Sequence, residues 1–281
     1  MNTSAVVCNV CPRHCALEEG SYGSCGARVA LEGAVRPAYY GVLTALALDP
    51  IEKKPLRHFH PGSRVLSLGS LGCNMHCPFC QNHDISQRIP GENTWEAEGR
   101  EFTPAEILRI AKEAAADGNI GVAYTYNEPL VCFEYVRDCA VLIRKAGMFN
   151  VLVSNGCVTD DVTDEILPLM DAMNIDLKGF RPDIYERLGG NLAAVKRFIT
   201  RASESAHVEI TSLIVPGFND SASEMEEEAE WLSSLKNEPV LHLTRYFPNY
   251  RYGEPATDIG LLRELKEIAG RYLKRVYLGN V

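Results

Sequence analysis

The sequence predicts an α/β protein, a partial (β/α)6 TIM-type barrel with a small N-terminal cysteine-rich metal-binding extension. From residue 63 onward, short apolar runs typical of strands alternate with longer stretches typical of helices. Such alternation implies parallel strands joined by right-handed crossovers, and six strand-helix units are fewer than the eight of a closed barrel. The first 60 residues instead combine turn residues with closely spaced cysteines. We therefore expect two units, the extension over 1–60 and the barrel over 61–281.

The barrel elements follow one another in chain order. We expect strands over 64–70, 120–126, 150–154, 173–177, 207–215 and 239–246. We expect helices over 104–117, 129–145 and 221–235, one starting near 159, two short pieces within 181–206, and a last one over 257–273. The first helix has the clearest start, because Thr103 precedes Pro104 and Glu106 stands at the third helical position.

Composition bounds the class of protein. The 281 residues are 46% hydrophobic and 23% charged, as in ordinary globular proteins. A net charge of −9 does not favour a nucleic-acid partner. No apolar run reaches the ~18 residues of a membrane span, and the N-terminus does not read as a signal peptide. We expect a cytoplasmic protein without a membrane partner.

Cysteines are concentrated in two places. Of the ten cysteines, seven fall in two tight clusters, which metal or cluster ligation explains better than disulfides in a long chain without a signal peptide. The first cluster is Cys8, Cys11, Cys15 and Cys25. Four thiols this close can complete one tetrahedral site, and either zinc or an iron-sulfur cluster would satisfy them. Four free buried thiols are the alternative.

The second cluster, Cys73, Cys77 and Cys80, lies in a loop just past the first barrel strand. A 4Fe-4S cluster is normally closed by four cysteines, so a three-cysteine loop leaves one iron open to another ligand. An electron-transfer cluster gains nothing from an open iron, whereas a cluster that binds and reduces a substrate needs one. Zinc is the weaker alternative, because structural zinc usually takes four protein ligands.

Polar residues follow the other predicted strands. Because the carboxyl ends of parallel strands meet at one mouth, these residues are expected to share a site with the cysteine loop. They are Asn127 and Glu128, Ser154 and Asn155, Asp176 and Lys178, with the apolar Val215 after the fifth strand.

The segment from Gly72 to Cys80, with the aromatic Phe79 before the last cysteine, resembles the signature of the radical S-adenosylmethionine (SAM) superfamily. This resemblance implies a 4Fe-4S cluster on Cys73, Cys77 and Cys80 as the catalytic group, with SAM chelated on the open iron. An electron from a reductant protein such as a flavodoxin or ferredoxin then cleaves SAM to the 5'-deoxyadenosyl radical. The protein supplies positioning and protection.

SAM carries an ammonium, a carboxylate, a ribose and an adenine, and the strand ends offer a partner for each. Within the SAM-binding set that also contains Asn127 and Ser154, we assign four roles. They are Glu128 or nearby backbone for the ammonium, Lys178 for the carboxylate, Asp176 and Asn155 for the ribose, and Phe79 with Val215 for the adenine.

Residues 64–250 are similar to the glycyl-radical-enzyme activases, whose type is pyruvate formate-lyase activating enzyme. Residues 154–156 match their T-N-G segment, 175–178 their D-x-K segment and 215–220 their V-P-G-x-x-D segment, whereas their G-G-E is here Tyr126-Asn127-Glu128. The chain also resembles the AmmeMemoRadiSam system radical SAM enzymes. This resemblance rests on that departure, on the N-terminal cysteines, and on residues 49–55, 77–82 and 124–129. Many of those enzymes continue into a tail with another cysteine pair, so a chain ending at Val281 is expected to be short or trimmed.

The activase resemblance implies an activase-like oxidoreductase that abstracts hydrogen from a substrate, most simply a glycine of a partner protein. Radical modification of a small molecule or peptide is the alternative. A non-catalytic iron-sulfur electron carrier is a third reading.

Overall fold

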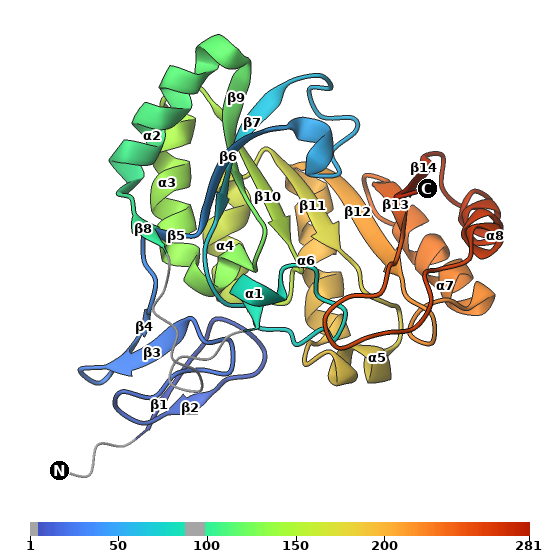
Figure 1. The fold of residues 1–281 in the computed structure, drawn as a ribbon, viewed down its shortest axis with the longest axis horizontal. Helices are drawn as coiled ribbons and strands as arrows, with labels where there is room; N and C mark the ends of the chain where they lie inside the picture. Colours follow the sequence, from blue (N-terminus) through green and yellow to red (C-terminus); the bar gives the residue numbers. More distant parts are fainter. Residues whose placement is uncertain (1–4, 88–98) are drawn as a thin grey trace.

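The computed structural model describes residues 5–87 and 99–281, and in these ranges one large sheet carries the fold (Figure 1). Its strand order is β14-β13-β12-β11-β10-β9-β7-β6. The strands are β6 Ala45–Pro50, β7 Arg64–Gly69, β9 Asn119–Tyr124, β10 Phe149–Ser154, β11 Ala172–Asp176, β12 His207–Ile214, β13 Val240–Arg245 and β14 Val276–Gly279. All neighbouring pairs are parallel except β6 with β7. The predicted α/β fold with a parallel sheet is confirmed, and a partial barrel is consistent with it.

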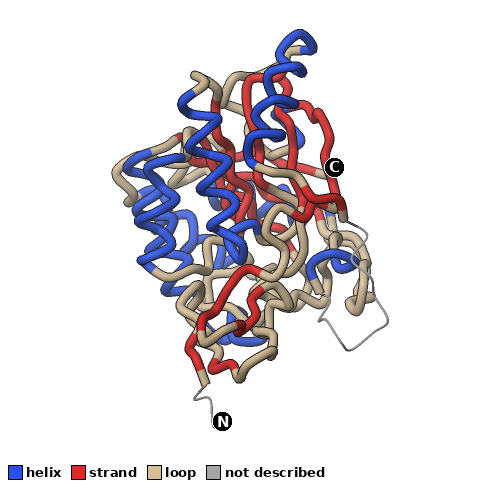
Figure 2. The backbone as a smooth tube through the Cα atoms, turned by 90° about the vertical axis from the view of Figure 1, so that its left-hand side faces the viewer, coloured by secondary structure: helices blue, strands red, loops and turns tan. Residues whose placement is uncertain are grey.

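Helices connect the parallel strands and pack against one another along one side of the sheet (Figure 2). They are α2 Pro104–Glu113, α3 Phe133–Lys145, α4 Asp160–Ile166, α5 Pro182–Arg187, α6 Leu192–Ser205, α7 Ala222–Ser233 and α8 Ile259–Ala269, whereas the short α1 His83–Ser86 follows the cysteine loop. The second helical piece expected within 181–206 is longer than predicted, since α6 has 14 residues. Because the helices cover the sheet, residues of its central strands such as Leu152, Met173 and Ile210 are fully buried.

Local signals in the sequence explain where several helices begin. Thr103 and Glu106 form the predicted capping box at the start of α2. The side chains of Asn191, Ser221 and Asp258 accept backbone N–H groups at the starts of α6, α7 and α8. Each cap satisfies an otherwise orphaned donor, which typically stabilises a helix by about 1 kcal/mol.

Residues 51–60 cover the amino ends of the barrel strands, opposite the predicted site. Ile51 and Leu56 are fully buried against residues of β7, β9, β10 and β11. The Pro55 carbonyl accepts from Asn174 Nδ2 at 3.0 Å, and His58 N–H donates to Glu209 Oε1 at 2.7 Å. This segment therefore closes the floor of the barrel.

The first part of the predicted N-terminal extension, residues 5–37, lies at the carboxyl end of the barrel strands (Figure 1). It contains β1 Val6–Val7 paired with β2 Ala16–Leu17, and the hairpin of β3 Arg28–Leu31 with β4 Ala34–Pro37. Strands β5 Val42–Leu43 and β8 Arg100–Glu101 form a separate two-stranded sheet beside α2 and α3. The division at residue 60 stays a prediction, and β6 within 1–60 is part of the large sheet.

No helix in the described part of the chain is long and apolar enough to cross a membrane.

Candidate active site

The cysteine loop begins directly after β7, at the carboxyl end of the sheet. Cys77 is buried, whereas Cys73 and Cys80 are partly exposed. Gly72 has a left-handed backbone with φ +87°, and a Cβ there would lie 2.6 Å from the carbonyl oxygen of Cys25. Glycine alone fits this approach, so the loop turns closely against the N-terminal extension.

Hydrogen bonds fix the loop and reach one of its sulfurs. The His76 N–H donates to the carbonyl of Leu188 at 2.7 Å. The Met75 N–H donates to Cys73 Sγ at 3.4 Å, and the side-chain amide of Asn155 donates to the same sulfur at 3.7 Å. Donors around a sulfur favour its thiolate form, which is the form that binds metal.

Burial changes the pKa values of two of the three thiols. Burial raises the pKa of Cys73 above its usual value, and burial raises the pKa of Cys77 to about 11 although the nearby Lys178 ammonium opposes the rise. A thiol with the pKa of Cys77 is protonated at neutral pH, so a metal that binds it must displace a proton.

Glu128 follows β9 and is only 2% exposed. Its Oε1 accepts from Ser154 Oγ at 2.8 Å and from the Leu130 N–H at 3.0 Å, and its Oε2 accepts from the Asn155 N–H at 2.8 Å. Burial raises the pKa of Glu128 to about 7 in spite of these donors. The carboxylate thus braces the loop after β10 from within the strand-end site.

Asn155 connects that loop to the cysteine loop. Its Nδ2 donates to Asn74 Oδ1 at 2.9 Å, and its Oδ1 accepts from the Cys157 N–H at 2.8 Å. Asn74 in turn donates to the Cys157 carbonyl at 2.6 Å. Two of these buried contacts, Asn155 to Asn74 and Asn74 to Cys157, join the two loops.

Asp176 and Lys178 form an ion pair at the end of β11. Lys178 Nζ lies 2.9 Å from Asp176 Oδ2, and their side chains are 20% and 36% exposed. Burial alone would lower the pKa of Lys178, but Asp176 and the Cys77 sulfur hold that pKa above its usual value. Lys178 is therefore a cation, partly open to a ligand, beside the cysteine loop.

Phe79 and Val215 lie in an apolar wall. Phe79 is buried, and its ring meets that of Phe218 edge-on at 5.3 Å between centroids. The rings of Tyr246 and Tyr252 pack around the same ring at 6.4 and 6.3 Å. Val215 is buried and its carbonyl accepts from the Phe218 N–H. These contacts form an aromatic cluster beside the loop.

The side-chain amide of Asn127 forms hydrogen bonds with backbone groups. Its Oδ1 accepts from the Ser70 N–H at 3.0 Å, and its Nδ2 donates to the Gly72 carbonyl at 3.1 Å. Both amide ends thus bind the cysteine loop, so Asn127 positions that loop in this structure.

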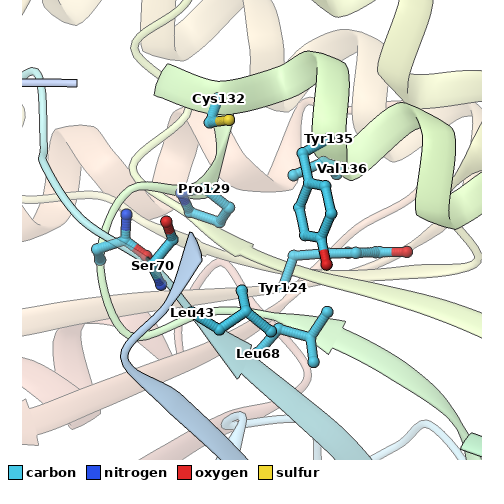
Figure 3. Close-up of a pocket in the computed structure, with 9 residues that line it drawn as sticks. Leu43, Leu68, Ser70, Tyr124, Pro129, Cys132, Tyr135 and Val136 are labelled. Atoms are coloured by element: carbon cyan, nitrogen blue, oxygen red, sulfur yellow. Dashed lines mark hydrogen bonds between the residues drawn. The ribbon is translucent and has the colours of Figure 1, made fainter. Parts of the chain in front are cut away.

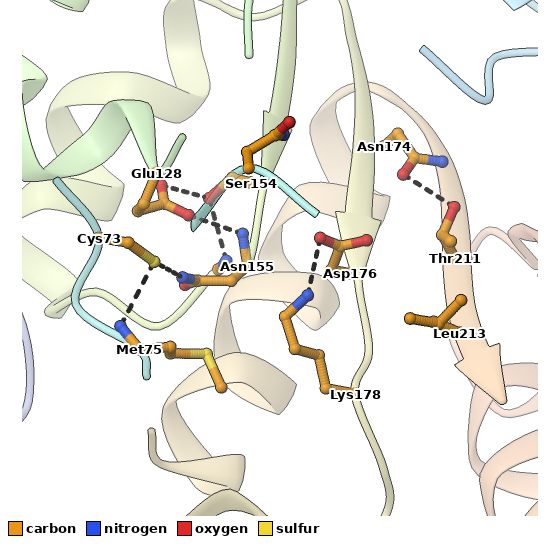
Figure 4. Close-up of polar contacts among 12 residues, drawn as sticks. Cys73, Met75, Glu128, Ser154, Asn155, Asn174, Asp176, Lys178, Thr211 and Leu213 are labelled. Carbon is orange, nitrogen blue, oxygen red and sulfur yellow. Dashed lines mark hydrogen bonds and ion pairs between the residues drawn. The ribbon is translucent and has the colours of Figure 1, made fainter. Parts of the chain in front are cut away.

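The strand ends converge as the sequence predicts. Figure 4 shows Cys73, Glu128, Ser154, Asn155, Asp176 and Lys178 side by side across neighbouring strand ends, with Thr211 and Leu213 beyond them on β12. The role of each residue toward SAM stays a prediction.

Sequence reasoning missed two residues. Asn74 is 3% exposed and links three segments, and its place between two cysteines of the loop was the available signal. Tyr126 has φ +72°, and its hydroxyl donates to Asp49 Oδ2 at 2.6 Å. Its partner lies 77 residues away in sequence, so no local pattern could reveal the contact.

The N-terminal cysteines lie together in the extension. Cys8, Cys11, Cys15 and Cys25 all line one small cavity. Within residues 5–87 and 99–281, no three or more Cys, His, Asp or Glu side chains form a group that could hold a metal ion. The expected second metal site is therefore not shown.

A separate cavity of about 20 Å³ lies between the sheet and α3 (Figure 3). Leu68, Tyr124 and Val136 line it, and so does Cys132. It has room for about one water molecule. Cys132 thus packs in an apolar interior rather than in the strand-end site.

Comparisons with known proteins agree with this geometry. An uncharacterized protein of Methanocaldococcus jannaschii, MJ0808, is 39% identical over 286 residues, which cover 100% of this chain and 83% of that protein. Pyruvate formate-lyase 1-activating enzyme of Escherichia coli is 28% identical over 195 residues, 66% of this chain and 75% of that enzyme.

Solved structures share the fold. Streptococcus suis SuiB bound to S-adenosylmethionine superposes with a TM-score of 0.58 at 15% identity, over 75% of this chain and 49% of that chain. The model of the radical SAM superfamily matches residues 68–232, from β7 to α7. This match spans more than half of the chain and includes the cysteine loop, so the chain belongs to the radical SAM superfamily.

Proposed function

We propose that this protein reductively cleaves SAM on a 4Fe-4S cluster and abstracts hydrogen from a glycine of a protein substrate. Membership of the radical SAM superfamily implies the cluster and SAM. The observation that carries the proposal is the convergence of the three-cysteine loop with Glu128, Asp176 and Lys178 at one edge of the sheet. The similarity to an activating enzyme over 66% of the chain supports a protein substrate.

The residues of the loop suit an anionic iron-sulfur cluster. Three thiols stand in one loop, and Met75 and Asn155 direct N–H groups to Cys73 Sγ. Lys178 adds a positive charge near Cys77. When bound, the cluster and SAM supply the electron transfer and bond cleavage that generate the 5'-deoxyadenosyl radical.

The strand-end residues have binding and orienting roles in this proposal. Lys178 exchanges part of its contact with Asp176 for the SAM carboxylate, which frees Asp176 to accept from the ribose hydroxyls beside Asn155. Glu128, whose carboxylate braces the loop after β10, or nearby backbone accepts hydrogen bonds from the ammonium. Phe79 and Val215 offer apolar surface for the adenine, which also helps to exclude water.

Radical modification of a small molecule or peptide is the second candidate. It is favoured by the N-terminal cysteines, because the Cys25 carbonyl accepts from the Cys73 N–H at 3.3 Å. A metal centre held there would lie beside the cluster loop, as an auxiliary centre near a substrate would. A purely electron-carrying role is disfavoured by the polar strand ends, which such a carrier does not need.

Two further parts of the proposal concern the surroundings of the enzyme. A one-electron reductant such as a flavodoxin or ferredoxin is required by reductive cleavage. All ten cysteines, which lie within the described ranges, are free, and free thiols in this number suit the reducing cytoplasm.

The test is anaerobic formation of 5'-deoxyadenosine by reconstituted, reduced protein. We expect product from the wild type and none from Cys73→Ala, Cys77→Ala or Cys80→Ala, because each removes a cluster ligand. Cys139→Ala, which alters a buried thiol on α3, is the matched control and should retain activity. Cleavage that survives loss of the loop cysteines would overturn the proposal. To separate the two candidates, a glycyl-radical protein of the same organism is added, and its EPR doublet is sought.

A further inference from the structure

The N-terminal extension encloses a small space lined by sulfur. Besides the four thiols, the cavity is lined by Arg28 and Asn74, and its free volume is about 10 Å³. This is the volume of about one water-sized sphere. The Cys8 N–H donates to the Cys15 carbonyl at 2.9 Å, which closes the chain around the cavity.

Arg28 lines this cavity and also carries a buried donor that has no partner. The residue is 4% exposed. Its Nη1 lies 2.8 Å from both carboxylate oxygens of Glu134, and its Nη2 donates to the Val35 carbonyl at 3.4 Å. Its Nε is buried without a hydrogen-bond partner. A buried donor left unpaired destabilises the folded state, so an acceptor is expected beside it.

Metal-bound sulfur is an acceptor that fits this place. Thiolates carry negative charge and accept hydrogen bonds, and four of them satisfy either a zinc ion or an iron-sulfur cluster. We infer that Cys8, Cys11, Cys15 and Cys25 together hold one thiolate-bound metal centre, with Arg28 Nε donating to its sulfur ligands. Since the described side chains do not yet form a group around an ion, the thiols turn toward one another on loading.

This centre is joined to the catalytic loop by direct contacts. The Cys73 N–H donates to the Cys25 carbonyl at 3.3 Å, and Asn74 both lines the cavity and accepts from Asn155. Loading the N-terminal centre therefore also fixes the backbone beside the first catalytic cysteine. This inference does not depend on the radical chemistry proposed above.

The test uses the variant Cys73→Ala/Cys77→Ala/Cys80→Ala, which lacks the loop ligands. After anaerobic reconstitution with iron and sulfide, or with zinc alone, we expect about one zinc or about four iron atoms per chain. Mössbauer spectra and metal analysis distinguish the two. Adding Cys8→Ser and Cys11→Ser should abolish the binding, and adding Cys139→Ala should not.

A folded triple variant that retains neither metal would overturn the inference. If the triple variant does not fold, the wild type is analysed instead, and the inference then requires about four further iron atoms or about one zinc beyond the loop's own cluster. SAM cleavage plays no part in either readout, so failure of the proposed function leaves the result intact.

The role of Arg28 has its own readout. Arg28→Lys keeps the charge near Glu134 but lacks Nε–H, and it should release the metal to a chelator about tenfold faster or more, as for other residues that support metal ligands. Arg36→Lys is the matched control, because Arg36 pairs with Glu32 while its side chain is 54% exposed. If the two variants released the metal at the same rate, Arg28 would have no role in holding the metal centre.

Discussion

Lys53 and Lys54 are neighbours with opposite environments. The side chain of Lys53 is 62% exposed and that of Lys54 is 2% exposed, and both contact the carboxylate of the buried Asp49. The Lys54 ammonium also lies 4.6 Å from the ring centre of Tyr126. In the sequence the segment 49–55 reads either as a family feature or as a solvated turn. The structure buries two of its charges, Asp49 and Lys54.

We expect Lys54→Met to lower the free energy of unfolding by about 3–5 kcal/mol, because it leaves Asp49 with less compensation in the interior. Lys53→Met should cost less than about 1 kcal/mol, as for other exposed pairs. Urea denaturation measures both. If the two variants lost the same free energy of unfolding, burial would not explain the different environments of the two lysines.

The Asp49 contacts also predict a dependence on pH. Burial opposes ionisation of Asp49, but hydrogen bonds from Lys54 and Tyr126 hold its pKa below the usual value. Its contribution to stability is therefore present above the unfolded pKa of about 4. That contribution is lost as the pH falls toward the folded value.

Glu228 on α7 has the opposite shift. It is 1% exposed, accepts from Ser212 Oγ at 2.5 Å, and its pKa is raised to about 8 by burial. Its stabilising contribution is complete below the unfolded pKa and is lost as the pH rises through about 8. Glu228→Gln should thus raise the melting temperature at pH 9 and change it little at pH 4. Glu227→Gln, which alters an exposed residue, should not raise the melting temperature at pH 9. If Glu228→Gln raised the melting temperature at pH 4 but not at pH 9, the assignment of the raised pKa to Glu228 would be wrong.

At the scale of elements, the cysteine loop depends on one close approach. Gly72 and Gly62 both have left-handed backbones, with φ +87° and +83°, but only Gly72 has neighbours within 4 Å of an added Cβ. Gly72→Ala should therefore disturb the loop and lower the iron content after reconstitution. Gly62→Ala should show only backbone strain of about 1 kcal/mol and normal iron. Equal iron content in the two variants would show that the approach to Cys25 is unimportant.

Elements with local signals were predictable, and elements defined by distant partners were not. The start of α2 follows from Thr103, Pro104 and Glu106, which lie next to one another in sequence. No local signal in the sequence identifies β6, because this strand is defined by its pairing with β7. The helix from 192 to 205 has 14 residues and is longer than the short piece that the sequence predicts.

For the whole molecule, the alternation of strands and helices was enough to predict the parallel sheet. Parallel strands then place their carboxyl ends together, so the convergence of Glu128, Asn155 and Asp176 was also predictable. The docking of the extension on the loop was not, because the contact of Cys25 with Cys73 joins residues far apart in sequence without a shared pattern. Closure of the floor by residues 51–60 is hidden for the same reason.

The most direct test of the catalytic centre is the EPR spectrum of the reduced loop cluster, recorded with and without SAM. Cys8→Ser/Cys11→Ser protein is used, so that the cluster on Cys73, Cys77 and Cys80 alone contributes. An iron that lacks a protein ligand should bind SAM directly, and the account predicts that SAM changes the g-values of the spectrum. An intact cluster whose spectrum is unchanged by saturating SAM would contradict it.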